Sequence, residues 1–172
     1  MPDRDQEFGD YFEARLPRMR ASAFLLCGDW HLAEDLVQTA FTKVYLAWHR
    51  LERREALDQY VATVLVRSFI DEKRRGWWRR ERATGEPPET PVPRADAPEE
   101  RMAMWQVLSA VPPRQRAALV LRFWEDLSVQ ETAQVLACSV GTVKSQTARG
   151  LQTLRALLGA QPCDYADAVT RP

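Results

Sequence analysis

Toward the C-terminus of this chain, hydroxyl, amide and guanidinium side chains recur at the spacing of one helix face. This polar face consists of Thr142, Ser145, Gln146, Arg149 and Thr153. Such side chains hydrogen-bond the edges of bases, and an α-helix fits the major groove of DNA. The chemistry predicted for this face is recognition of duplex DNA, without a covalent step.

A short helix is expected just before it. Ser128 and Glu131 are spaced as a capping box, in which each side chain satisfies a free backbone N–H at a helix start. The apolar residues that follow at helical spacing are Val129, Ala133 and Leu136. Ala137-Cys138-Ser139 then breaks the pattern, and Ser139 is a second N-cap residue.

The second helix has a predicted buried stripe of Val143, Thr147, Leu151, Leu154 and Leu158. Together the two helices and their tight turn indicate a helix-turn-helix with an outward polar face. The alternative is an ordinary helical hairpin whose polar face is simply solvated.

Composition narrows the class of protein. The chain has 172 residues, a formal net charge of zero and 45% hydrophobic residues, which predicts a soluble globular protein of one or two domains. No apolar run approaches the roughly 20 residues that cross a bilayer, and no signal peptide is recognised at the start. We therefore expect a cytoplasmic location. Cys27, Cys138 and Cys163 form no CxxC pair, so we expect no disulfide framework, no metal and no cofactor.

A Pro-rich acidic segment divides the chain. Residues 83–98 lack apolar periodicity and are expected to form a flexible linker spanning roughly 20 Å. The predicted organisation is an all-α fold with two small helical domains, the second a four-helix domain with the helix-turn-helix. The expected boundaries are a first domain at 1–82, the linker, a second domain at 99–160 and a short tail at 161–172.

Three helices are expected in the first domain. An apolar stripe from Phe8 to Leu26 is interrupted by Pro17, and Gly28 and Asp29 predict a helix stop and a new N-cap. The second helix has one apolar face, and its opposite face is polar, with Asp35, Gln38, Thr39 and Thr42. The third is expected from about Leu57 to Arg75 and becomes basic toward its end.

That basic end continues into a segment with two tryptophans. From Arg67 to Arg82 there are 7 basic and 3 acidic residues, and Trp77 and Trp78 stand between pairs of arginines. Aromatic planes beside phosphate-binding charge are typical of proteins that bind single-stranded or locally opened nucleic acid. The alternatives are a solvated helix end, tryptophans that pack against a core or a partner, and binding of RNA independent of any polymerase.

The chain resembles the extracytoplasmic-function class of bacterial sigma factors, over residues 8–159 and in the expected order. The segments that carry the resemblance are Ala33–Phe41, Val64–Arg75, Pro112–Arg122 and Val140–Ser145. The run Leu25–Gln38 is most similar to the actinobacterial-type subgroup of this sigma-70 family. The resemblance implies a promoter-specificity subunit with two helical domains and no central domain between them.

The resemblance also implies roles for particular residues. The clamp of the polymerase β′ subunit would be bound by Asp35, Gln38, Thr39 and Thr42. The minus-ten promoter element would be contacted and opened by Arg67, Asp71, Lys73, Arg74, Arg75, Trp77, Trp78, Arg79 and Arg80. The minus-thirty-five element would be read by Arg114, Ser139, Thr142, Lys144, Ser145, Gln146 and Arg149, in a domain that sits on the β flap.

Three residues depart from the family pattern. Arg67 stands where the family usually has Asn, Gln146 where a basic residue is frequent, and Thr39 where an acidic residue is common. The promoter sequence therefore cannot be carried over from relatives.

The implied partners are core RNA polymerase, promoter DNA and an anti-sigma factor. No Gly-rich phosphate loop or catalytic triad is evident, so we expect no enzyme. The alternative from another class is a stand-alone helix-turn-helix transcriptional regulator with an N-terminal dimerisation or sensing domain.

Overall fold

The computed structural model describes residues 4–51, 54–82 and 99–159, and within these ranges the fold is all-α, without a β-strand. The α-helices are α1 (Arg4–Cys27), α2 (Trp30–Ala47), α3 (Arg54–Arg82), α4 (Glu99–Leu108), α5 (Pro113–Leu119), α6 (Val129–Leu136) and α7 (Val140–Leu158). A 3-10 turn, η1 (Trp48–Arg50), follows α2, and a π-helical turn, η2 (Val120–Trp124), continues α5. None of the helices described in these ranges has both the length and the apolar character needed to cross a membrane.

The turn between α1 and α2 forms as its sequence predicts. Gly28 adopts a positive φ of 70°, a conformation that favours glycine at a helix end. Asp29 caps α2 by accepting a hydrogen bond from the Leu32 backbone N–H at 3.0 Å. Both the predicted helix stop and the predicted N-cap are confirmed.

Two of the expected helices are longer than their sequence patterns indicate. The interruption expected at Pro17 is wrong, because α1 runs unbroken through this residue to Cys27. A proline removes one backbone donor, and the buried residues on the following turns, from Met19 to Cys27, keep the helix packed beyond it. Helix α3 extends at both ends beyond the predicted Leu57–Arg75.

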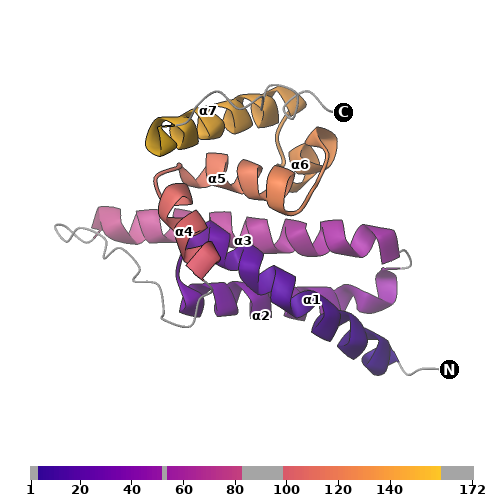
Figure 1. Ribbon diagram of the computed structural model, residues 1–172. Coiled ribbons are helices and arrows are strands. Elements are labelled where there is room, and N and C mark those ends of the chain that lie inside the picture. The colour runs from indigo at the N-terminus through magenta and orange to yellow at the C-terminus, as the bar shows by residue number, and fades with distance from the viewer. Residues whose placement is uncertain (1–3, 52–53, 83–98, 160–172) are drawn as a thin grey trace.

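The C-terminal elements lie along one side of α3, and α2 lies along its other side (Figure 1). In that view α7 is the outermost element, with α5 and α6 between it and α3. Helices α5 and α7 approach closely at Gly150, where an added Cβ atom would lie 2.9 Å from Leu119 Cδ1. A side chain there would force the Leu119 side chain to shift.

The two halves of the chain share one buried apolar cluster. Phe24 and Leu26 of α1 belong to it, as do Trp105 of α4, Leu121 of η2 and Val135 of α6. The sequence left the relative placement of the halves open, and the predicted linker at 83–98 lies outside the described residues. Because the helices before and after this segment bury apolar side chains against each other, they form a closed arrangement, meaning the packing of α4, α5, η2 and α6 against α1 and α3.

Candidate nucleic-acid interface

Both helices of the helix-turn-helix begin at a serine N-cap, and the first of these caps is reciprocal. Ser128 accepts a hydrogen bond from the Glu131 N–H at 3.1 Å, and Glu131 accepts one from the Ser128 N–H at 2.7 Å, which confirms the capping box. Ala137 then turns the chain with a φ of 50°. Ser139 caps α7 by accepting a hydrogen bond from the Thr142 N–H at 3.1 Å, as predicted.

A small apolar cluster holds the two helices at their angle. Val143 of α7 is fully buried against Val129 and Ala133 of α6, and Leu136 and Cys138 cover it in part. Val143 and Thr147 are buried as predicted. The prediction that Leu158 is buried is wrong, because 63% of this residue is exposed. The buried stripe ends before the last turn of α7, where residues 155–159 are all exposed.

Most of the predicted base-reading side chains are exposed. Lys144, Ser145 and Arg149 project from α7 into solvent, and Ser139 and Arg114 are exposed as well. Thr142 and Gln146 are half-buried instead, because they face the N-terminal half of the chain. The face therefore has an open part and a covered part.

The basic end of α3 presents its charges beside this covered part. Arg67, Asp71, Arg74 and Arg75 are exposed, and the Lys73 ammonium lies 6.0 Å from the centre of the Phe69 ring. The backbone of α3 is described to Arg82. The side chains of Trp77, Trp78, Arg79 and Arg80 fall outside the described residues, so their predicted role is not examined by the structure.

A cleft of about 240 Å³ lies between α3 and the helix-turn-helix. Its α3 wall includes Arg67 and Asp71, and its other wall includes Arg114, Thr142 and Gln146. The structure thus brings together residues that the sequence assigned to two different DNA contacts. Arg67 crosses the cleft and donates hydrogen bonds to the backbone oxygens of Val135 and Gln134, both at 3.3 Å.

The polar face of α2 points away from this cleft. Asp35, Gln38, Thr39 and Thr42 are all exposed, as predicted for a face that docks on another protein. Leu46, one turn further along, is 65% exposed and extends this face with an apolar side chain. A polar surface with an exposed apolar end suits protein binding more than nucleic-acid binding, which needs positive charge.

Sequence reasoning missed Glu125, which follows η2 and is buried against α1. Its carboxylate accepts hydrogen bonds from Arg15 at 3.3 Å and Arg18 at 3.2 Å, and from the Ser22 hydroxyl. Arg18 also donates to the Trp124 backbone oxygen at 2.6 Å. Only 7% of the Glu125 side chain is exposed, whereas its partners Arg15 and Arg18 are 18% and 45% exposed. No local periodicity identifies such a contact, because its partners are more than 100 residues away.

Arg116 was also missed, because it lies in a run of residues that looks like a basic surface. Its guanidinium is 6% exposed, lies 4.7 Å from the Trp105 ring centre, and donates to the backbone oxygens of Leu26 at 2.6 Å and Val111 at 3.0 Å. Burial lowers the pKa of Arg116 to about 10, and the neighbouring Cys27 opposes that change. Burial likewise raises the pKa of the Cys27 thiol to about 11.

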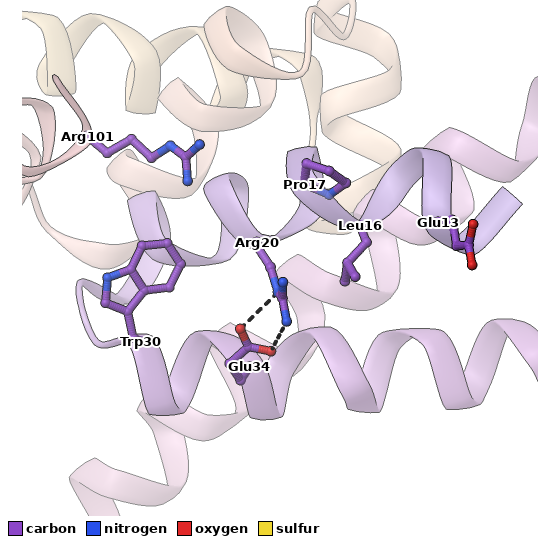
Figure 2. Close-up of a pocket in the computed structure, with 7 residues that line it drawn as sticks. All are labelled: Glu13, Leu16, Pro17, Arg20, Trp30, Glu34 and Arg101. Atoms are coloured by element: carbon purple, nitrogen blue, oxygen red, sulfur yellow. Dashed lines mark hydrogen bonds and ion pairs between the residues drawn. The ribbon is translucent and has the colours of Figure 1, made fainter. Parts of the chain in front are cut away.

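A second hollow, formed by α1, α2 and α4, is unsuited to nucleic acid (Figure 2). Arg20 and Glu34 occupy its centre and pair with each other at 2.9 Å and 3.2 Å, so the arginine charge is already neutralised. Glu13 and Arg101 lie toward opposite ends and have opposite charges. In the described part of the chain, no group of three His, Cys, Asp or Glu side chains is arranged to hold a metal ion.

Comparisons with known proteins match both halves of the chain. Residues 11–79 match the family described as Sigma-70 region 2, and residues 101–154 match Sigma-70, region 4. The chain is 36% identical to the RNA polymerase sigma-E factor of Streptomyces coelicolor, over 92% of this chain and 89% of that protein. It is 30% identical to the ECF RNA polymerase sigma factor EcfG of Rhodopseudomonas palustris, over 84% of this chain and 81% of that protein.

A solved structure has a similar fold. It is the sigma factor RpoE of Bartonella quintana in complex with the anti-sigma factor NepR. The TM-score is 0.77 at 25% identity, and the match covers 91% of this chain and 99% of that one.

Proposed function

This chain belongs to the sigma-70 family, in its extracytoplasmic-function group, and we propose that it directs core RNA polymerase to specific promoters and initiates transcription there. The observation that carries this function is that both promoter-binding regions of the family are matched in one chain, in order. A stand-alone regulator is not favoured, because its N-terminal half would have no reason to match Sigma-70 region 2.

The helix-turn-helix is assigned to the minus-thirty-five element. Lys144, Ser145 and Arg149 are exposed on α7, and the N-terminal part of such a helix contacts base edges in the major groove. Arg114 adds a positive charge at the start of α5, suited to a phosphate. Thr142 and Gln146 belong to the same proposed reading face, and both are half-buried where they line the cleft.

The basic end of α3 is assigned to the minus-ten element. Arg74 and Arg75 are exposed beside Arg67, which gives the helix surface a local positive charge. Trp77 and Trp78 follow in sequence and are proposed to stack on bases of the opened strand. Extruding a base from the stack costs a few kcal/mol, and stacking returns about 1–3 kcal/mol per captured base. The mechanism is thus the use of binding energy for strand opening, with no covalent step.

The polar face of α2 is assigned to the polymerase. Asp35, Gln38, Thr39 and Thr42 are exposed there, and Leu46 adds apolar area at one end. Bacterial RNA polymerase works in the cytoplasm, and we extend that location to this chain. The similar solved structure is a complex with an anti-sigma factor, and we include a partner of that kind in the proposal.

A pull-down with core RNA polymerase, followed by transcription of fragmented genomic DNA, tests this function. Wild-type chain should bind core polymerase and yield defined transcript starts. Gln38→Ala and Asp35→Ala should lower both the amount of core polymerase bound and the yield of transcript, since truncating a central interface side chain weakens binding severalfold or more. Gln106→Ala is a matched control, because Gln106 is an exposed glutamine on α4. Equal retention of all variants would refute docking through α2, and absence of any transcript with wild-type chain would refute the function itself.

A further inference from the structure

Three hydroxyl side chains lie near the start of α7, on the face proposed to read the minus-thirty-five element. Ser139 and Thr142 are engaged with each other, because the Ser139 hydroxyl oxygen accepts from the Thr142 backbone N–H at 3.1 Å and the two hydroxyl oxygens lie 2.9 Å apart. Thr142 is also half-buried. Ser145, one turn further along, is exposed, so its hydroxyl is open to a base in the major groove.

The Ser145 hydroxyl has a single proton, and the helix already uses it. The hydroxyl oxygen lies 3.0 Å from the backbone oxygen of Thr142. A carbonyl oxygen can only accept, so the serine hydroxyl is the donor in this hydrogen bond. Ser145 therefore presents to solvent an oxygen with acceptor lone pairs and no proton left to donate.

This polarity decides which groups of DNA suit Ser145. Phosphate oxygens only accept, and so do N7 and O6 of guanine and O4 of thymine. To bind any of these, Ser145 would have to break its hydrogen bond with Thr142. The N6 amino group of adenine and the N4 amino group of cytosine are donors, so either can bind Ser145 while that bond stays in place. A hydroxyl that donates one hydrogen bond is also polarised to accept another more strongly.

The two cations beside Ser145 have the opposite polarity. Arg149 is exposed one turn later on the same helix face, and its guanidinium has N–H donors only. Lys144 is exposed as well, and its ammonium also only donates. Both suit phosphates and the acceptors of guanine. Of the three exposed α7 side chains assigned to the minus-thirty-five element, Ser145 alone offers an acceptor.

We propose that Ser145 is a specificity-determining residue of α7, because its hydroxyl oxygen accepts a hydrogen bond from the amino group of an adenine or a cytosine in the minus-thirty-five element. This inference rests on the proposed function for the identity of that element. Such a contact reads sequence, whereas a contact with phosphate would only position the helix.

Promoter duplexes that contain single base analogues test this polarity. Unsubstituted purine in place of adenine, or pyrimidinone in place of cytosine, removes the amino group. A purine analogue with carbon in place of N7 removes an acceptor instead. Each analogue is placed in turn along the minus-thirty-five element of a promoter identified by transcription with core polymerase. The affinity of the full-length chain, assembled with core polymerase, is then measured for every duplex.

Loss of one particular amino group should weaken binding of the wild-type assembly about fivefold, as expected for a single hydrogen bond. Ser145→Ala should weaken binding to the natural promoter by about the same factor, and it should no longer respond to loss of that amino group. Alanine is favourable at an exposed helix position, so circular dichroism should show unchanged helix content.

Ser109→Ala is the matched control. The exposed Ser109 hydroxyl also donates to a backbone oxygen three residues earlier, that of Gln106 at 2.8 Å, but it lies at the end of α4, outside the proposed DNA-binding surfaces. Ser109→Ala should respond to every analogue as the wild-type chain does. Two results would overturn the inference: Ser145→Ala stays as sensitive as wild type to loss of each amino group, or it loses sensitivity to a missing N7 instead.

Arg149→Ala separates this failure from failure of the proposed function. Because Arg149 only donates, its variant should lose sensitivity to a missing N7 of guanine and keep the sensitivity to missing amino groups. If neither Arg149→Ala nor Ser145→Ala changes any base dependence, α7 does not read the element and the inference falls with that assignment. If the wild-type chain directs no initiation by core polymerase, the proposed function itself is refuted.

Discussion

Gly28→Ala is expected to destabilise the protein strongly, for two separable reasons. Gly28 has a φ of 70°, where an alanine is less favourable than glycine by roughly 1–2 kcal/mol. A Cβ atom would also lie 1.9 Å from Trp105 Cε2 and 2.0 Å from Cζ2, far inside van der Waals contact. The indole would have to move, which typically costs about 1–3 kcal/mol in a packed core. The expected loss in the free energy of unfolding is therefore about 2–5 kcal/mol.

Gly159→Ala is the control for the backbone contribution. Gly159 has a similar φ of 58°, and an added Cβ meets nothing within 4 Å among the described residues. Gly159→Ala should therefore lower the free energy of unfolding by only roughly 1–2 kcal/mol. Urea unfolding followed by circular dichroism measures both variants, and the difference between them isolates the contact with Trp105.

A double-mutant cycle then assigns the steric part to its partner. Combining Gly28→Ala with Trp105→Leu should recover about 1–3 kcal/mol relative to the sum of the single losses, because the smaller side chain leaves room for the methyl group. Additive losses, or equal losses for Gly28→Ala and Gly159→Ala, would refute the reasoning. Trp105 of α4 would then not pack against the turn between α1 and α2.

Two further predictions concern a cap and a thiol. Ser128→Ala should lower the free energy of unfolding by about 1 kcal/mol and weaken minus-thirty-five binding, because the Glu131 backbone N–H at the start of α6 loses its hydrogen-bond acceptor. Ser109→Ala is the control in urea unfolding and gel shifts, because it removes a hydroxyl hydrogen bond at the end of α4 and leaves the caps of the helix-turn-helix intact. Cys27, with its pKa raised to about 11, should react with iodoacetamide at pH 8 far more slowly than in urea. Because the pKa of Cys27 is higher in the folded than in the unfolded chain, its contribution to the free energy of unfolding is fully present below the pKa of the unfolded chain and declines as the pH rises toward 11. Unfolding measured over this pH range, with Cys27→Ala for comparison, checks this dependence.

Caps and periodic faces were predictable from the sequence because they depend on residues a few positions apart. Ser128, Glu131 and Ser139 satisfy backbone groups within three residues, so their roles follow from spacing alone. The exposed face of α2 follows equally from a period of 3.6 residues. The helix-turn-helix and its outward side chains could therefore be predicted from the sequence alone.

Contacts between distant segments were not predictable in this way. Arg116 and Glu125 look like surface residues in the sequence, yet each is buried by a partner more than 80 residues away. Leu158 continues the apolar stripe of α7 and so looks like a buried residue, but it is 63% exposed. Periodicity identifies which face of a helix is apolar, but not where the neighbouring element ends.

Arg67 shows how the two kinds of information combine. Its place on the basic α3 predicts a contact with DNA phosphate, and its hydrogen bonds to Val135 and Gln134 place it on a helix C-terminus of the same chain. Both partners offer negative charge, so one guanidinium satisfies either of them but not both at once. A neutral residue at this position would lack the charge that favours both the α6 carbonyls and the phosphate. Arg67 thus makes a contact within the folded chain that the charge pattern of α3 alone does not predict.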